Sequence, residues 1–352
     1  MENKIRVHII PEYGIDFRPH GSAYIRLLRP LYHPLLSSKL IVTDSVTYDD
    51  ILDSTQVVIV DRFWRPDINL EYAKILIDKI KEVHAKFVYA FDDDFFALQA
   101  VRKDFPTSRH IEVFEFFLQN ADSLLVTTDF LKNKYKSWND AVQVLPNFMD
   151  ERLICGMKIQ PVVNEVVRIG YMGTLTHKDD LEMVLPVLSN LHQKFGSRIR
   201  FELLGAVTPE ILENNKIDFP IYNIPTNPEN YEYPLFMSWF TSTVNWDIGI
   251  SPFKDYEFNK AKSYIKFLDY AAIQAAGIFS KIEEYQKVIR PGENGFLAEN
   301  LQDWEASFIE LIENSVLRNN IKKSVYFDLL NQHTIRKNIT RIYKTIQDIL
   351  LS

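Results

Sequence analysis

Residues 247–272, DIGISPFKDYEFNKAKSYIKFLDYAA, contain the pattern that decides the fold. They begin with a short apolar run, which predicts a buried strand ending at Ile250. A polar loop follows, and residues 262–275 then show the apolar spacing of an amphipathic helix. A strand that leads through a loop into a helix is the repeating unit of α/β proteins, so the segment predicts a doubly wound α/β domain.

The predicted helix carries Lys262, Ser263, Lys266 and Asp269. Positions 262 and 266 are one helical turn apart, so both ammonium groups are expected on one helix face near its amino terminus. Free N–H groups and the positive end of the helix dipole lie there too, and the pattern therefore predicts a diphosphate site. Asp269 is expected to accept hydrogen bonds from sugar hydroxyls. A lysine-rich face that is only solvated surface is the alternative.

The same alternation of short strands and amphipathic segments extends through the first half of the chain. This order predicts an α/β domain with a mainly parallel sheet. The predicted strands are 5–10, 57–60, 87–91, 123–126 and 142–145, and the predicted helices are 24–36, 72–84, 109–119 and 130–135.

After residue 150 the periodicity is lost until residue 166, where the pattern of strands and helices restarts. The predicted strands there are 167–171, 199–204, 221–224, 247–250 and 277–280, and the predicted helices are 179–194, 262–275, 302–313, 316–330 and 334–351. The sequence therefore predicts an N-terminal Rossmann-like domain (1–150), a linker (151–165), a second Rossmann-like domain (166–330) and a C-terminal helical segment (331–352). Two such domains are expected to face each other across a ligand-binding cleft.

The composition is that of a soluble globular protein: 352 residues, 46% hydrophobic and 25% charged, with a net charge of −7. The negative balance argues against nucleic acid as a partner. A single cysteine, Cys155, excludes an intramolecular disulfide and a cysteine-rich zinc site, and favours a cytoplasmic setting. No run approaches 18 apolar residues, so we expect at most peripheral contact with the inner face of a membrane.

Polar loops follow two of the strands predicted in the first half. Residues 14–29 combine Gly21 and Ser22, which can approach a ligand and begin a helix, with positive charges that include Arg26. This loop predicts contact with an acceptor or a phosphate, and an ordinary loop with surface arginines is the alternative.

Three carboxylates, Asp92, Asp93 and Asp94, follow the strand predicted at 87–91. Adjacent carboxylates can hold a divalent cation or act as acid and base. However, successive side chains diverge along an extended segment, so the three cannot all face one point. Hydrogen bonding to an acceptor is therefore favoured over a metal site, and a solvated strand end is the alternative.

A small-residue loop follows the first strand of the second half, in residues 168–185 (RIGYMGTLTHKDDLEMVL). Gly173 and Thr174 lead to His177 and Lys178 at the start of a predicted helix, which favours a phosphate-facing site. The glycines do not form the GxGxxG fingerprint, and the chain has no Walker motif, so neither pattern supports a nicotinamide or ATP site. There is also no GxSxG nucleophile elbow, so nothing indicates a serine hydrolase.

These segments resemble a known family. The second half is similar to the donor-binding domain of GT-B glycosyltransferases around glycosyltransferase family 4, as seen in VRIGYMGTLTHKDDLEMVLPVL, FELLGA, DIGISPFKDYEFNKAKSYIKFLDYAA and VIRPGENGFLAENLQDW. The first half resembles the acceptor domains of members that assemble bacterial polysaccharides, through GSAYIRLLRPL, VVIVDRFW, FDDDFF and VLPNF. Together the two resemblances span nearly the whole chain.

The resemblance implies transfer of a sugar from a UDP, GDP or dTDP donor to a saccharide, lipid-linked or protein-linked acceptor. Such transfer usually retains the configuration of the sugar and needs neither an obligatory metal nor a cofactor. The resemblance also implies that the C-terminal helix packs back on the N-terminal domain. The implied donor contacts are Gly173, Thr174, Lys262, Ser263, Lys266 and Asp269, with Lys262, His177 and Lys178 stabilising the leaving diphosphate.

One position departs from the family pattern. Many members place a glutamate that contacts the donor sugar eight residues before the second acid, and here that position is Ala261. Asn259, Lys262 and Glu257 are the candidate replacements. Two other functions therefore stay open, a nucleotide-sugar epimerase and a non-catalytic partner subunit that keeps the fold. Product formation from the donor alone would indicate the epimerase, and donor binding without any transfer would indicate the partner subunit.

Overall fold

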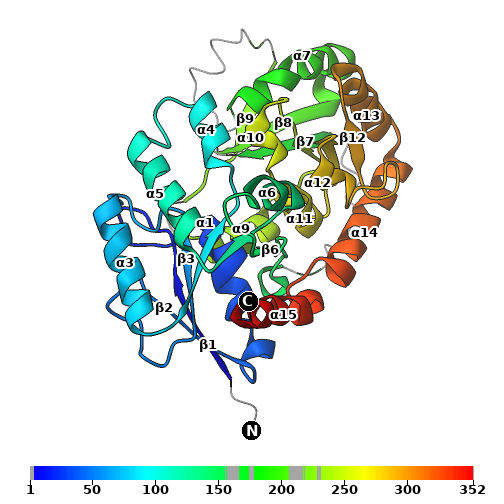
Figure 1. The fold of residues 1–352 in the computed structure, drawn as a ribbon. Helices are drawn as coiled ribbons and strands as arrows, with labels where there is room; N and C mark the ends of the chain where they lie inside the picture. The colour runs from blue at the N-terminus through cyan, green and yellow to red at the C-terminus, as the bar shows by residue number, and fades with distance from the viewer. Residues whose placement is uncertain are drawn as a thin grey trace. The chain divides into compact units, whose positions relative to one another are not determined.

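The computed structural model describes residues 4–154, 156, 166–173, 178–205, 217, 219–227 and 231–351 of the protein (Figure 1). The chain divides into two compact units. The first comprises Met1–Glu151, Lys260–Ser263 and Thr334–Ser352, and the second comprises Arg152–Asn259 and Tyr264–His333. Most of the segment 151–165, predicted to be a linker, lies outside the described residues.

The first unit is built on a six-stranded parallel sheet in the order β2-β1-β3-β4-β5-β6. Because helices cover both faces of such a sheet, its strands are continuous apolar runs, as in VVIVD of β3. Five of the strands were predicted from this pattern, whereas β2, a partly exposed edge strand, was missed. The strands are β1 (Ile5–Ile10), β2 (Leu40–Asp44), β3 (Val57–Asp61), β4 (Lys86–Phe91), β5 (Ser123–Val126) and β6 (Val142–Val144).

Strand β4 shows how the two faces of this sheet are covered. Phe87 and Tyr89 contact the rings of Phe117 and Phe114 on helix α5 (Ser108–Asn120). Val88, which points the opposite way, belongs to the apolar cluster that includes the C-terminal helix. The other helices of this unit are α3 (Leu70–Glu82), α4 (Phe95–Val101) and α6 (Asp129–Tyr135), and the side chain of Asn69 caps α3 by accepting a hydrogen bond from Tyr72 N at 2.9 Å.

The helix predicted at 24–36 is shorter than expected. The structure has α1 (Gly21–Ala23), a π-helical turn at Tyr24–Leu28 and α2 (Arg29–Leu31), followed by a separate 3-10 turn at Pro34–Leu36. The prediction extended too far because His33 precedes a proline, whose ring disfavours helical backbone at the residue before it. His33 is accordingly extended, with ψ 130°.

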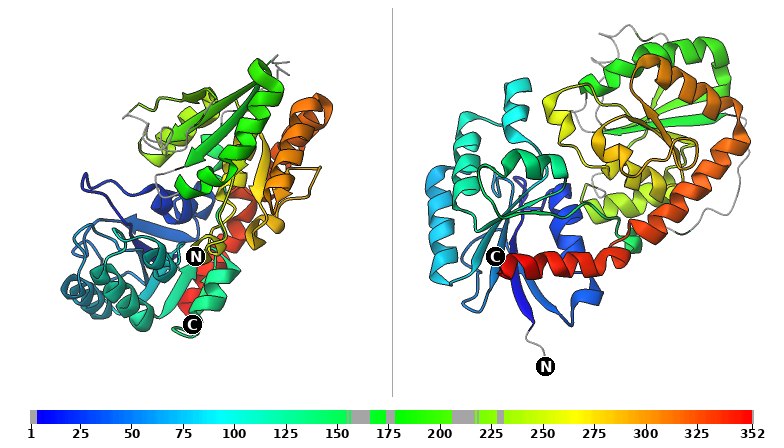
Figure 2. Two further views of the ribbon diagram at one scale, coloured as in Figure 1. Left: turned by 90° about the horizontal axis from the view of Figure 1, so that it is seen from above. Right: turned by 45° about the vertical axis from the view of Figure 1, so that its right-hand side comes forward.

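The C-terminal helix α15 (Ile339–Leu351) contributes to the core of the first unit (Figure 2). Ile342, Ile346 and Ile349 are spaced by four and three residues, so they lie on one helix face, and all three are fully buried. They join Ile9 of β1 in one apolar cluster. The apolar stripe that the sequence shows in this segment is thus a core face.

The second unit has another six-stranded parallel sheet, in the order β12-β11-β10-β7-β8-β9. Numbered from its own first strand, this is the 3-2-1-4-5-6 order of dinucleotide-binding folds. The predicted doubly wound α/β class is therefore confirmed. The strands are β7 (Val167–Gly173), β8 (Ile199–Gly205), β9 (Ile221–Asn223), β10 (Ile248–Ser251), β11 (Ala276–Ser280) and β12 (Phe296–Ala298).

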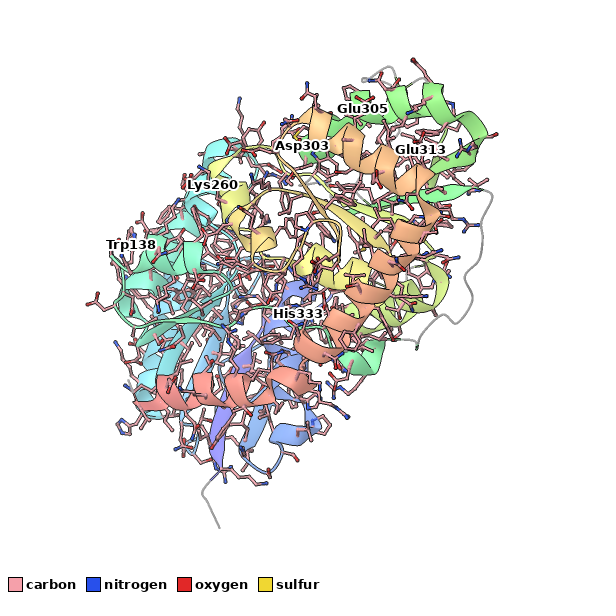
Figure 3. All side chains as sticks on the ribbon, turned by 90° about the vertical axis from the view of Figure 1, so that its right-hand side faces the viewer. Trp138, Lys260, Asp303, Glu305, Glu313 and His333 are labelled. Carbon is pink, nitrogen blue, oxygen red and sulfur yellow. The ribbon has the colours of Figure 1, made fainter. Side chains whose placement is uncertain are left out.

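Helices cover the second sheet as well. The apolar faces of α7 (Lys178–Phe195) and α13 (Leu301–Glu313) share one core cluster with the strands, in which Trp304 is almost fully buried. Figure 3 shows the acidic Asp303, Glu305 and Glu313 along α13. The remaining helices are α9 (Tyr233–Thr243), α10 (Glu257–Lys260), α11 (Ile265–Ala272), α12 (Glu283–Gln286) and α14 (Ser315–Gln332). Among the described residues, none of the helices has the length and apolarity needed to span a lipid bilayer.

Candidate active site

Each sheet has one point where the direction of winding reverses, and doubly wound sheets bind ligands outside the carboxyl ends of the strands at that point. In the first sheet the reversal lies between β1 and β3, and in the second between β7 and β10. The loops that follow these strands carry most of the candidate residues, so the two edges are described in turn.

The first edge is occupied by a cluster of ion pairs centred on Arg62, which directly follows β3. Its guanidinium donates to Asp92 Oδ1 at 2.7 Å, to Asp93 Oδ2 at 2.8 Å and to Glu12 Oε2 at 3.4 Å. The Arg62 side chain is 19% exposed. Carboxylates from the loops after β1 and β4 therefore converge on one cation, which fixes both loops against the end of β3.

The backbone of Arg62 adopts a conformation that is unusual for a residue other than glycine. Its φ is 44°, in the left-handed region. The same residue donates its backbone N–H to Ala90 O at 2.8 Å, which ties it to the end of β4. Left-handed backbone costs an L-residue about 1–2 kcal/mol, and the ion pairs offset that cost.

Arg26 and Asp61 form the deepest ion pair of this edge, and both are buried. Burial raises the pKa of Asp61 to about 6, although the positive charge of Arg26 acts in the opposite direction. The sequence predicted that Arg26 would face an acceptor or a phosphate. Instead, the guanidinium is buried against Asp61. The prediction failed because the sequence pattern could not reveal this buried partner.

His20 and Glu12 form the outer part of the cluster, with His20 Nδ1 3.3 Å from Glu12 Oε2 and the His20 side chain 49% exposed. The hydrogen bond to Glu12 raises the pKa of His20. Burial would raise the pKa of Glu12, but the hydrogen bond from His20 and the charge of Arg62 outweigh it and lower that pKa. The carboxylate is thus held in its charged form beside the imidazole.

Counting the charges of the cluster explains the role of His20. Apart from His20, the described cluster has four carboxyl groups and three permanent cations, so a protonated imidazole adds a fourth positive charge. The carboxylates are Glu12, Asp61, Asp92 and Asp93, and the cations are Arg26, Arg62 and Lys262.

Lys262 joins this cluster from the segment Lys260–Ser263, which belongs to the first unit. Its ammonium donates to Asp93 Oδ1 at 2.7 Å. Next to it, Ser263 Oγ accepts a hydrogen bond from Asn147 Nδ2 at 2.8 Å. The predicted placement of Lys262 one turn before Lys266 on a single helix is therefore wrong. Helix α11 begins only at Ile265, because the side chains of 262 and 263 are held by partners outside the helix.

The three adjacent aspartates diverge. Asp92 and Asp93 face Arg62, whereas Asp94 is the N-cap of α4, accepts a hydrogen bond from Tyr135 Oη at 2.8 Å and pairs with Lys134. Asp94 is thus a buried helix cap and not the cleft residue that the sequence predicted. Within the described part of the chain, no group of three or more His, Cys, Asp or Glu side chains is arranged to hold a metal ion.

Gly21 and Ser22 begin α1, close along the chain to His20. Ser22 Oγ is buried and has no hydrogen-bond partner among the residues that the structure describes. Their predicted contact with an acceptor stays a prediction.

At the second edge, β7 ends at Gly173, where a larger residue would be crowded. A Cβ on Gly173 would lie 2.9 Å from the hydroxyl of Tyr171, closer than real Cβ contacts. Thr174 and His177, which the sequence places in the donor loop, lie outside the described residues. Lys178 is the first residue of α7, and its side chain also lies outside the description.

The loop after β10 is fastened to the start of α7. Asp180 Oδ1 accepts hydrogen bonds from the backbone N–H of Lys254 and from Asn259 Nδ2, both at 2.8 Å. Asn259 Nδ2 also donates to Lys254 O at 2.9 Å. The sequence offered Asn259 as a sugar contact, but the donors of its buried amide are used inside the protein to shape this loop.

Further hydrogen bonds fix the same edge to β11. Ser251 Oγ lies 2.8 Å from Tyr285 Oη, and the backbone N–H of Phe253 donates to Ser280 Oγ at 2.7 Å. Phe253 also stacks on Tyr285 with 5.9 Å between ring centroids. These contacts come from neutral side chains and a backbone N–H.

On α11, Lys266 Nζ lies 3.4 Å from Asp269 Oδ2. Asp269 is buried, and burial raises its pKa, while Lys266 acts against that shift. Lys266 and Asp269, both predicted to bind the donor, are therefore neighbours. The ammonium of Lys266 compensates a carboxylate that would be costly to bury alone.

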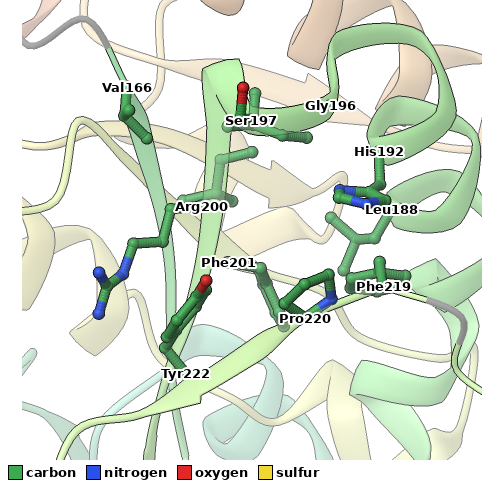
Figure 4. A pocket seen from close by; sticks show the side chains of 12 residues that line it. Val166, Leu188, His192, Gly196, Ser197, Arg200, Phe201, Phe219, Pro220 and Tyr222 are labelled. Atoms are coloured by element: carbon green, nitrogen blue, oxygen red, sulfur yellow. The ribbon is translucent and has the colours of Figure 1, made fainter.

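A pocket of about 320 Å³ opens elsewhere in the second unit (Figure 4). It is lined mainly by apolar side chains, with His192 and Arg200 among the polar ones. Because Ile199 begins β8 and Val166 immediately precedes β7, this pocket lies at the amino ends of the strands. It is therefore at the edge opposite the candidate site.

Sequence reasoning did not single out Glu12, Asp61, Arg62, Asn147 or Asp180 as site residues. The available signal was position, because Asp61 and Arg62 end a buried apolar strand in VVIVDRFW, where a parallel sheet presents its ligand-binding edge. Asp180 had no such signal, since an acid in the first turn of a helix is common for reasons of the helix dipole alone.

No protein-family model and no curated protein sequence matches the chain. Solved structures do match. Sucrose-phosphate synthase from Thermosynechococcus elongatus has a TM-score of 0.68 at 9% identity, over 99% of this chain and 100% of that one. HepE of Anabaena in complex with UDP-glucose has a TM-score of 0.63 at 9% identity, over 97% of this chain and 99% of HepE.

A third match is partial in length. TarM has a TM-score of 0.62 at 10% identity. The match covers 85% of this chain but 55% of the length of TarM. At these identities the likeness establishes the fold. The fold is that of the GT-B glycosyltransferases, with two Rossmann-like units, whereas membership of glycosyltransferase family 4 stays a prediction.

Proposed function

We propose that the protein is a glycosyltransferase that moves a sugar from a nucleoside diphosphate donor to a saccharide or glycoconjugate acceptor. The observation that carries the proposal is the segment after β10, which carries Lys254 and Lys266 at the winding reversal of the second sheet. Cations at that position suit a diphosphate. The structural neighbours agree with this chemistry, since HepE was solved with UDP-glucose and S. aureus TarM with UDP.

In the proposed reaction the bond between the anomeric carbon and the donor diphosphate oxygen breaks, and the acceptor hydroxyl oxygen bonds to that carbon. The hydroxyl attacks the face of the sugar that the diphosphate leaves, so the configuration is retained. Its proton passes to the leaving diphosphate, so no protein base is required. Lys262, with His177 or Lys178, stabilises the growing negative charge. One such preorganised group typically contributes about 3 kcal/mol. Lys266 and Asp269 hold the diphosphate and the ribose.

The finer assignment follows the resemblance. The donor is a hexosyl or deoxyhexosyl derivative of UDP, GDP or dTDP, and the acceptor is a saccharide that is free or linked to a lipid or a protein. The pathway is the synthesis of a bacterial surface polysaccharide or glycan, in the cytoplasm or at the inner face of the membrane. Neither a metal nor a cofactor is required.

A donor screen followed by one substitution tests the proposal. Thermal shifts with UDP-, GDP-, dTDP- and CMP-sugars identify the donor, because a ligand that binds only the folded state raises the melting temperature. With that donor and an acceptor panel, Lys262→Ala should lower kcat roughly 100-fold to 1,000-fold, the usual effect of removing one such group.

The matched control is Lys260→Ala, which removes an exposed lysine two residues away and should leave kcat within about threefold of the parent protein, as for surface substitutions in general. Circular dichroism must show that both variants are folded. Near-normal transfer by Lys262→Ala would contradict the assigned role of this lysine. Product from the donor without an acceptor would instead identify an epimerase.

A further inference from the structure

The lysine assigned to the donor diphosphate already has an anionic partner in this structure. Lys262 Nζ is 2.7 Å from Asp93 Oδ1, and the two side chains are 17% and 13% exposed. Asp93 uses its other oxygen, Oδ2, to accept from Arg62 at 2.8 Å. One carboxylate therefore bridges two cations, and one of those cations is the group that the donor would need.

We infer that Asp93 is a displaceable counter-ion that competes with the donor diphosphate for the ammonium of Lys262. The inference rests on the proposed function and adds regulation to the same site. When the diphosphate arrives, Lys262 transfers its contact from the carboxylate to a phosphate oxygen. Both partners carry negative charge, so the exchange replaces one charge-assisted hydrogen bond by another of the same kind.

Arg62 makes this exchange favourable. A carboxylate left unpaired in a largely buried position would be costly, and a contact that cannot be released would block the site. Asp93 keeps its hydrogen bond to Arg62 after Lys262 leaves, so the carboxylate is not left without a cationic partner.

The segment that carries Lys262 has other anchors. Ser263 Oγ accepts from Asn147 Nδ2 at 2.8 Å, and Thr128 Oγ1 donates to Ala261 O at 3.4 Å. Neither bond involves Asp93. Removal of the carboxylate charge should therefore leave the segment in place and change only the competition for the ammonium, which makes Asp93→Asn an informative variant.

The experiment is a double-mutant cycle read by isothermal titration calorimetry, with UDP and inorganic pyrophosphate as probes. The proteins are the parent, Asp93→Asn, Lys262→Ala and the double variant. Asp93→Asn should bind both probes roughly threefold to tenfold more tightly, the factor that corresponds to releasing one partly exposed ion pair. In the Lys262→Ala background the same substitution should have no effect.

The outcomes separate this inference from the proposed function. If Lys262→Ala does not weaken binding of either probe, the assignment of Lys262 to the diphosphate fails. If Lys262→Ala weakens binding but Asp93→Asn leaves it unchanged or weaker, only the competition by Asp93 is overturned. An equal gain from Asp93→Asn with and without Lys262 would also overturn it, because the carboxylate would then act on the probe directly.

A second variant at position 93 provides the same test if Asp93→Asn does not fold. Asp93→Ser removes the charge with a smaller side chain, and a melting curve by circular dichroism shows whether each protein is folded. The matched control is Asp104→Asn, which removes a carboxylate from the exposed pair with Arg102 in the same unit. That control should leave the affinity for both probes unchanged.

Discussion

The two winding reversals of this molecule are built from different chemistry. At the first, between β1 and β3, Arg62 bonds carboxylates from two other loops, and the side chains are mostly charged. At the second, between β7 and β10, the loop after β10 is held by two bonds to the carboxylate of Asp180 and by bonds between neutral groups. The neutral bonds include Asn259 Nδ2 to Lys254 O and Phe253 N–H to Ser280 Oγ. The first edge thus pairs its charged side chains with one another. The bonds given for the loop after β10 involve one charged side chain, Asp180.

The two kinds of bonding respond differently to the loss of one member. Ion pairs in a partly buried cluster need every member, because loss of one leaves another charge uncompensated. Neutral hydrogen bonds shape a loop and leave the electrostatic field of nearby lysines for a ligand. Substitutions at the first edge are therefore expected to lower the free energy of unfolding more than substitutions at the second edge.

The strongest test of this contrast is Arg62→Met, which keeps the length of the side chain and removes its charge. Glu12, Asp92 and Asp93 would each lose a partner, and breaking a buried ion pair costs about 3–5 kcal/mol. We expect urea unfolding to show a loss of that size in the free energy of unfolding.

The control for this substitution is Arg102→Met, which breaks an exposed pair with Asp104. Exposed pairs contribute about 0–1 kcal/mol, so this variant should be nearly as stable as the parent protein. Equal losses from the two substitutions would contradict the contrast between a linked cluster and an isolated surface pair.

A smaller effect is expected at the second edge for Asn259→Ala. The substitution removes the amide that donates to Asp180 and to Lys254 O, and a buried acceptor left without its donor costs about 1–3 kcal/mol. Asp180 keeps its bond from the Lys254 N–H, which limits the loss. Thermal and urea unfolding measure it.

Asn331→Ala is the matched control, because that exposed amide donates to Phe327 O on its own helix. It should change the free energy of unfolding by less than about 0.5 kcal/mol, as is usual at the surface. If Asn259→Ala were equally mild, the loop after β10 would not depend on this amide.

The same contrast explains which features the sequence could predict. Buried parallel strands are continuous apolar runs, so β3 and β5 were placed to within one residue. The fold class followed from the alternation of strands and helices. The start of α11 could not be predicted, because Lys262 and Ser263 are held by Asp93 and Asn147, which are more than a hundred residues away along the chain.

Long-range partners also explain the errors at the candidate site. The sequence pattern shows that Arg26 lies in the segment after the first strand and that Asp94 follows a buried strand. It does not show that Arg26 is paired with Asp61 or that Asp94 caps α4. Periodicity reports burial along a single element, whereas pairing between loops depends on the order of strands in the sheet. The position of an acid directly after a buried strand was the most useful signal.

The smallest expected effect is a pH dependence of the first edge through His20. Its folded-state pKa is raised above the ordinary 6.5, so its stabilising pair with Glu12 is fully present below about pH 6.5 and is lost as the pH rises through the folded pKa. Because the imidazole is half-exposed, the contribution should be below about 1 kcal/mol. Urea unfolding of the parent protein and His20→Gln should therefore differ at pH 6 and converge at pH 9. A difference that grew with pH would show that His20 is stabilising as the neutral imidazole, and the charge balance of the cluster would then need another proton.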